Sequence, residues 1–343
     1  MITITEYLLS QNPKMKNQSS PKVVKKQKKQ IVRTTEYTEK ATNETIKDIV
    51  KKAIEEKGNN VNLNYLDVSE VTDFRWVFSR RDFCGDVSEW DMHNAINTQA
   101  MFFDCKKFNC DLSNWDVSNV IIMNEMFSGC ENFNSKLNNW DVSNVTDFKQ
   151  IFENCKNFNQ DISEWDTSSA IYMNHMFSRC ENFNQDISNW NVSNVENMTA
   201  MFDNCKSFTY DLNNWKPRNI KALRGMFQYC DNFNGYFDDW DVSNVKDFSW
   251  MFADCLKFEG NGLGSWNMKS AENLTGMFKG CKNFEADLSD WDVSSVEYTN
   301  LMFKGCENLD CSLINWNFRK LKGSRHMFDG CTKMEESFMP KLK

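Results

Sequence analysis

Apolar and polar positions along this chain recur with a fixed period of 25 residues. Tryptophan marks the period ten times, with a single step of 26, and both a cysteine and an apolar–Phe doublet keep the same register. The Trp column comprises Trp90, Trp115, Trp140, Trp165, Trp190, Trp215, Trp240, Trp266, Trp291 and Trp316. The Cys column comprises Cys105, Cys130, Cys155, Cys180, Cys205, Cys230, Cys255, Cys281, Cys306 and Cys331. Columns in register over ten units predict stacked repeats that share one continuous core.

Each unit has two halves with different patterns. Residues 145–155 carry apolar side chains at i, i+3, i+6, i+7 and i+10, which predicts a short helix. Residues 158–165 place three apolar side chains among Asn, Asp and Ser, which predicts a short strand or an extended turn. A period between about 20 and 29 residues is typical of leucine-rich repeats. The expected fold is therefore an α/β repeat solenoid, a right-handed coil of about 11 units with a short strand and a short helix in each.

The Phe-x-x-Cys-x-x-Phe core carries a family resemblance. Segments such as MFSRCENFNQDISNWNVSNV, residues 176–195, resemble the BspA-type leucine-rich-repeat surface proteins. In particular they are similar to a 25-residue repeat first catalogued as a mycoplasma protein of unknown function. The resemblance covers residues 45–335 and implies a non-enzymatic repeat scaffold. Such scaffolds often lie on bacterial surfaces and also occur in large DNA viruses and protists.

The two ends differ from the repeats. Residues 1–41 are expected to form a basic flexible arm, because they are rich in Lys, Gln and Ser and poor in apolar residues. Residues 42–60 are expected to form an N-terminal capping helix, begun by Thr42 or Asn43 and ended by Gly58. Residues 61–343 form the expected repeat solenoid, with degenerate first and last coils.

Composition and charge narrow the picture further. The 343 residues carry a net charge of −8, which divides into +6 for residues 1–60 and −14 for residues 61–343. No apolar run reaches 18 residues, so no membrane-spanning helix is expected. With no recognisable signal peptide or anchor and 13 Cys, the sequence favours an intracellular or virion-associated protein with reduced thiols. The family resemblance keeps the cell surface open as the alternative.

The candidate chemistry is limited. Metal sites need closely spaced ligand pairs, but the Cys column has a spacing of 25, so buried thiols are expected. Two Asp columns are expected to cap turns, with calcium between coils as the alternative. One follows Trp and contains Asp91, Asp116, Asp141, Asp166, Asp241 and Asp292; the other contains Asp111, Asp161, Asp186, Asp211 and Asp287. Three His and no nucleotide or zinc-hydrolase motif indicate that the chain is not an enzyme and needs no cofactor.

Binding is better supported, because two coils replace the neutral or acidic consensus with cations. The candidate partner-binding residues are Lys216, Arg218, Lys221 and Arg224 in one coil and Arg319, Lys320, Lys322 and Arg325 in another. The expected function is a scaffold for protein–protein interaction, or a structural or surface role, with a protein partner of unknown identity. The alternative is a nucleic-acid-associated protein, or an import signal, that uses the arm residues Lys22, Lys25, Lys26, Lys28, Lys29 and Arg33.

Overall fold

The computed structural model describes residues 35–342. Its regular elements are few: β1 (Glu39–Lys40), α2 (Ile46–Lys57), β2 (Leu66–Asp67), and the 3-10 turns η2 (Leu263–Ser265) and η3 (Glu336–Phe338). β1 and β2 pair in parallel, with Glu39 opposite Leu66. The pairing corrects the expected extent of the arm, because Ala41 is fully buried and its N–H donates to the Asp67 carbonyl at 2.9 Å. The other residues of the expected arm, 1–34, lie outside the described range.

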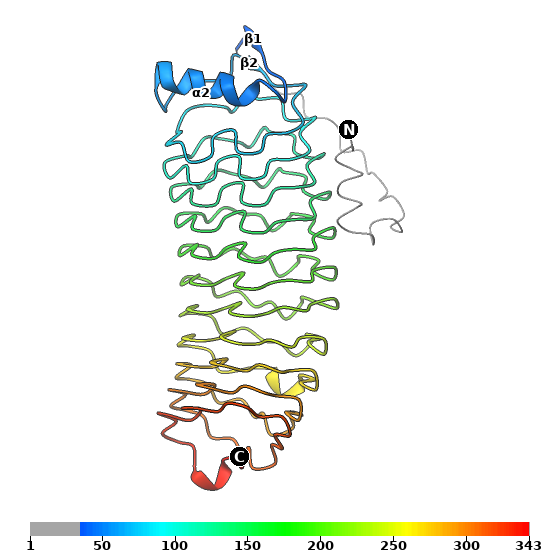
Figure 1. The fold of residues 1–343 in the computed structure, drawn as a ribbon, viewed down its shortest axis with the longest axis vertical. Helices are drawn as coiled ribbons and strands as arrows, with labels where there is room; N and C mark the ends of the chain where they lie inside the picture. The colour runs from blue at the N-terminus through cyan, green and yellow to red at the C-terminus, as the bar shows by residue number, and fades with distance from the viewer. Residues whose placement is uncertain (1–34, 343) are drawn as a thin grey trace. The chain divides into compact units, whose positions relative to one another are not determined.

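Helix α2 packs on the first coil and begins later than the sequence indicated. Thr45 is its N-cap, and Gly58 ends it with a φ of 88°. Ile46, Val50 and Ala53 form its buried face. Asn43 does not cap the helix. Its Oδ1 accepts the N–H of Thr72 at 2.9 Å, and this bond attaches the segment before α2 to the first coils. Figure 1 shows α2 beside the first coils.

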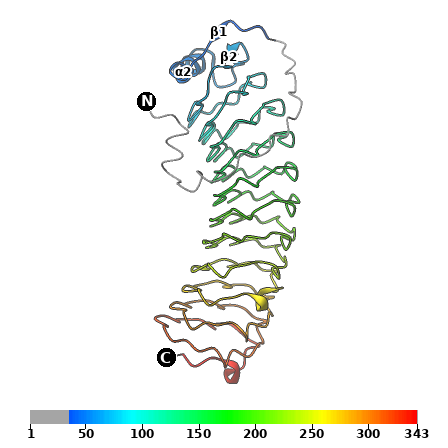
Figure 2. The ribbon, with the colours of Figure 1, turned by 90° about the vertical axis from the view of Figure 1, so that its right-hand side faces the viewer.

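From residue 61 onward the chain winds into coils that lie one on another (Figures 1 and 2). One position of each coil forms a parallel bridge with its equivalent in the next coil, for example Asn97 with Ile122 and Ile122 with Asp147. Between Asp73 and Gly323 these bridges are continuous, except that none joins Ala222 to Asp247. At this junction Lys221 and Lys246 occupy the same column of adjacent coils.

The helix expected at 145–155 is wrong, because this segment folds as consecutive turns. The N–H of Ile151 donates to the Phe148 carbonyl within the coil, whereas the N–H of Phe152 donates to Met176 in the next coil. Alternate residues thus bond within and between coils. Turns of three residues reproduce the i, i+3 spacing of a helix, so the apolar pattern alone does not separate the two structures.

Left-handed residues make these turns possible. Two positions in most coils have a positive φ, and the first directly precedes the apolar–Phe doublet; we call it the turn column. A non-glycine residue pays about 1–2 kcal/mol for this conformation, so the ladder and core must offset the strain. The turn column comprises Trp76, Ala100, Glu125, Gln150, His175, Ala200, Gly225, Trp250, Gly276, Leu301 and His326.

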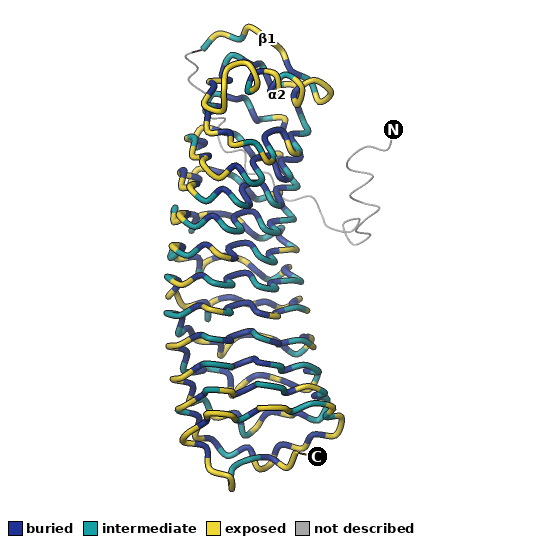
Figure 3. The backbone as a smooth tube through the Cα atoms, turned by 60° about the vertical axis from the view of Figure 1, so that its left-hand side comes forward, coloured by how far each residue is buried: buried dark blue, intermediate teal, exposed yellow. Residues whose placement is uncertain are grey.

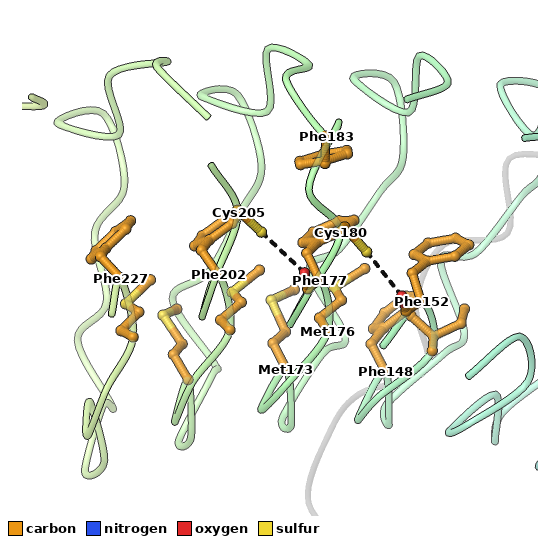
Figure 4. Close-up of a cluster of buried hydrophobic side chains, with 14 of the residues drawn as sticks. Phe148, Phe152, Met173, Met176, Phe177, Cys180, Phe183, Phe202, Cys205 and Phe227 are labelled. Carbon is orange, nitrogen blue, oxygen red and sulfur yellow. Dashed lines mark hydrogen bonds between the residues drawn. The ribbon is translucent and has the colours of Figure 1, made fainter. Parts of the chain in front are cut away.

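Buried stretches recur in every coil (Figure 3), and the Trp and Cys columns within them are hydrogen-bond donors as well as core residues. The indole Nε1 of Trp165 donates to the Leu137 carbonyl of the preceding coil at 3.0 Å, and all ten column Trp residues repeat this bond. The Cys180 thiol donates to the Phe152 carbonyl at 2.9 Å, and all ten column thiols do the same (Figure 4). The two columns therefore join each coil to the one before it.

Candidate partner-binding surface

The first basic coil presents four exposed cations, but two of them are ion-paired with neighbouring coils. Lys221 meets Glu196 at 2.7 Å, and Lys216 pairs with Asp239. Arg218 and Arg224 form no ion pair within residues 35–342. The charge available to a partner in this coil is therefore carried by the two arginines.

The second basic coil follows the same rule. Lys322 pairs with Glu297 at 2.8 Å, which raises the pKa of the Lys322 ammonium. Arg319, Lys320 and Arg325 are exposed and have no ion pair among the described residues. Arg325 and Arg224 occupy the same repeat position four coils apart. The two arginines therefore lie in one column, but the two basic coils are not in contact.

Paired lysines are general on this body. Lys156 meets Glu131 at 2.7 Å, and Lys246 meets Glu272 at 2.7 Å, each across one coil boundary. Because a column places residues 25 or 26 positions apart side by side, opposite charges at that spacing neutralise each other. Nine of the 18 Lys residues between positions 61 and 342 are paired with a carboxylate, which reduces the charge that they offer to a partner. Most of these pairs could have been predicted from the column spacing of the sequence.

An open groove of about 680 Å³ crosses the turn column next to Arg224. We call it the side groove. It exists because two small members of the turn column, Ala200 and Gly225, are consecutive there, between the larger His175 and Trp250. A Cβ at Gly276 would meet the Trp250 ring at 2.5 Å, so the indole lies over that glycine. The side groove is lined by His175, Thr199, Ala200, Asp203, Arg224, Gly225, Gln228, Tyr229, Trp250 and Lys279.

Charge in the side groove is mixed. Burial raises the pKa of the Asp203 carboxyl, and this rise is opposed by the Ser178 hydroxyl, which donates to Asp203 Oδ2 at 3.3 Å. Lys279 is held by Asp254 at 2.8 Å. The groove therefore offers one cation without an ion pair among the described residues, Arg224, beside the exposed ring of Tyr229. Of its lining residues, only Arg224 was singled out from the sequence.

The column thiols are unsuited to nucleophilic chemistry. Burial raises the pKa of the Cys105 thiol to about 12 and that of Cys331 to about 11. Thiolate is the reactive form, so these groups remain protonated donors at neutral pH. All 13 Cys are unpaired, and Cys84 is the exposed one.

The Asp columns cap turns, as the sequence favoured. Asp161 Oδ1 accepts the N–H of Ser163 at 3.0 Å, and Asp116 Oδ1 accepts that of Ser118 at 3.1 Å. Asn191 preserves the same bond to Ser193 where Asp is replaced. Turn N–H groups thus stabilise these carboxylates, and no group of three or more metal-ligating residues gathers within the described part of the chain.

Two further predictions concern the basic arm and a membrane-spanning helix. The arm residues Lys22, Lys25, Lys26, Lys28, Lys29 and Arg33 all lie outside 35–342. Within that range, no helix has the length and apolar character needed to cross a bilayer.

Comparison with known proteins identifies the repeats. A family model described as "Mycoplasma protein of unknown function, DUF285" matches residues 44–156, 123–238 and 222–340 in three overlapping segments. A search of curated proteins finds no match.

Proposed function

The chain belongs to this mycoplasma repeat family of unknown function, and from that premise we propose that it is a non-enzymatic scaffold for protein–protein interaction. We further propose that its coils form a leucine-rich-repeat-like solenoid of the BspA type. The regular parallel bridges between coils and the continuous buried core support this architecture. Thirteen unpaired thiols support an intracellular or virion-associated location, which is also part of the proposal.

The observation that carries the proposal is the side groove. Arg, Tyr and Trp are the residue types that dominate binding energy at protein interfaces. Arg224, Tyr229 and Trp250 gather in one open groove that spans several coils. An extended polypeptide with a carboxylate beside an apolar side chain matches this arrangement, since the carboxylate meets Arg224 and the apolar group meets the rings.

The test is a peptide selection on the intact chain. Peptides from a displayed random library are selected against the protein, and the dissociation constant of the best binder is measured by calorimetry. We expect Arg224→Glu and Trp250→Ala each to weaken binding by about tenfold or more, the loss typical of an interface anchor.

Matched controls are available outside the groove. Arg319→Glu reverses the charge of another exposed arginine, and Tyr172→Ala removes an exposed ring that is 41% accessible. Both controls should leave the dissociation constant within about twofold, and urea melts should show that all four variants are folded. Equal losses in groove and control variants, or no loss in the groove variants, would refute the proposed site.

A further inference from the structure

A row of amide side chains runs along one edge of the coils. The residue that directly follows the last Phe of the Phe-x-x-Cys-x-x-Phe core is Asn in five coils. Its Oδ1 accepts the N–H of the equivalent residue in the next coil, as Asn134 does from Asn159 at 2.9 Å. We call these residues the amide column: Asn109, Asn134, Asn159, Asn184 and Asn234.

The amide column fixes its acceptors and leaves its donors available. Each Nδ2 carries two N–H donors, and none of the five donates to an acceptor within residues 35–342. Asn109, Asn134 and Asn159 are exposed to solvent. The Phe108 and Phe133 rings that precede two of them have centroids 6.0 Å apart. The edge therefore presents a regular row of N–H donors that advances by about the same distance in each coil.

Two exposed tyrosines lie beside this row in consecutive coils. Tyr210 is 37% exposed and directly follows Thr209, which occupies the amide-column position between Asn184 and Asn234. Tyr236 is 49% exposed and lies two residues after Asn234. Neither hydroxyl has a hydrogen-bond partner in the part of the chain that the structure describes. Aromatic faces and amide donors thus share one edge.

Folding does not require these two rings. The coils before them carry Gln185 at the position of Tyr210 and Asp211 at the position of Tyr236. Gln185 Nε2 donates to the preceding coil at 2.8 Å, and Asp211 Oδ1 accepts a turn N–H at 2.9 Å. Each Tyr therefore replaces a side chain that stabilises its coil and exposes an aromatic ring to water, which is typical of a binding surface.

The chemistry of the edge selects a carbohydrate. Sugar rings combine C–H faces that pack on aromatic rings with hydroxyl oxygens that accept amide N–H groups. Asp161, Asp186 and Asp211 each lie two residues after an amide-column position and have no ion pair among the described residues, so an anionic chain is repelled. We propose that the amide column, Tyr210 and Tyr236 bind an extended neutral polysaccharide that runs across the coils. The proposal goes beyond the scaffold function and does not depend on the side groove.

An extended polypeptide fits this edge less well. Its backbone alternates N–H donors with carbonyl acceptors. The Oδ1 atoms of the amide column already accept backbone N–H groups, so the row offers donors and few open acceptors. Hydroxyl groups rotate to act as acceptors throughout, which matches a row of donors.

The experiment is calorimetry on the full chain with a β-1,4-linked glucose hexasaccharide, an extended neutral chain. We expect saturable binding with a dissociation constant below about 1 mM. The same hexasaccharide with each C6 oxidised to a carboxylate should bind at least about fivefold more weakly, because the Asp residues repel it. A neutral peptide of alternating Ser and Gly should show no saturation at the same concentration.

The variants restore residues that other coils already use. Tyr210→Gln and Tyr236→Asp should each weaken binding by about fivefold, the effect of losing one ring contact. Tyr172→Asp is the matched control, because it restores the residue of the equivalent Asp147 on another column. It should change the dissociation constant by less than about twofold, and urea melts should show that all three variants are folded.

The amide donors need a separate variant. Asn159→Asp keeps the Oδ1 acceptor and removes the donor, so it should weaken binding by about threefold without loss of the fold. Asn157→Asp makes the same charge change in the same coil, where Nδ2 already donates to Asn132 at 3.4 Å, and should have little effect. The proposal is overturned by absent hexasaccharide binding, by equal effects of test and control variants, or by tighter binding of the Ser–Gly peptide. None of these outcomes bears on the library selection at the side groove.

Discussion

Raising the pH tests the buried thiol column most directly. Desolvation raises the pKa of the column thiols above the ordinary value of 9.0, to about 12 for Cys105 and about 11 for Cys331. In the unfolded chain these thiols ionise near pH 9, whereas in the folded chain they stay protonated and donate to Phe carbonyls. Their contribution to stability is therefore complete below pH 9 and is lost as the pH rises toward 11–12.

The magnitude follows from the number of thiols. At pH 10, one thiol that ionises only after unfolding favours the unfolded chain by about 1.4 kcal/mol. Ten such thiols give roughly 14 kcal/mol, which is comparable to the whole stability of an ordinary domain at about 5–15 kcal/mol. We expect the free energy of unfolding to fall steeply as the pH rises above 9.

Urea unfolding in the presence of a phosphine reductant, followed by Trp fluorescence at several pH values, measures this loss. The control is a triple variant, Cys180→Ser, Cys205→Ser and Cys230→Ser, whose hydroxyls can keep the bonds to the Phe carbonyls and do not ionise. The pH-dependent loss should be smaller by about three tenths in this variant, while Lys and Tyr titrate equally in both proteins. Identical pH dependence in the two proteins would refute the reasoning.

Substitutions at three other features can be tested by urea unfolding. Gly276→Ala should cost roughly 2–4 kcal/mol, because its Cβ would strike the Trp250 ring. Gly305→Ala should cost about 1 kcal/mol for its positive φ alone, because its Cβ would meet Gly280 only at ordinary contact distances of 3.7–3.8 Å. Equal costs would contradict the placement of the indole. Asp161→Asn should change stability less than Asp161→Ala, because it retains the turn acceptor. Trp165→Phe should cost about 1–3 kcal/mol through the lost indole bond and packing, and a neutral result would contradict that bond.

The spacing of Trp and Cys was sufficient to predict which residues stack in the core. It was insufficient to predict how the backbone turns between them. Residues 145–155 satisfy a helical apolar pattern, but their turns depend on left-handed conformations at Gln150 and Asn154. The side chains of these residues do not predict that conformation. Both residues accept this strain because the N–H of each donates to the next coil.

The candidate sites divide in the same way. The basic residues were visible as departures from the consensus, and their pairing with Glu196 or Glu297 could have been deduced from the column spacing. The side groove was not visible. Ala200 and Gly225 resemble ordinary variation until the structure shows that they are adjacent in one column, with Trp250 after them.

The missing bridge between Ala222 and Asp247 has a mechanical consequence. At this junction the coils are still joined by bonds such as Gly225 to Ser249 and Phe227 to Met251, but the bond that the Leu223 N–H would donate to the Asp247 carbonyl is missing. A force applied along the stack is concentrated there, so rupture should begin at this seam and release two pieces whose ladders are intact. The side groove crosses the same seam, and a partner seated in it would act as a clamp that raises the force needed to part the coils.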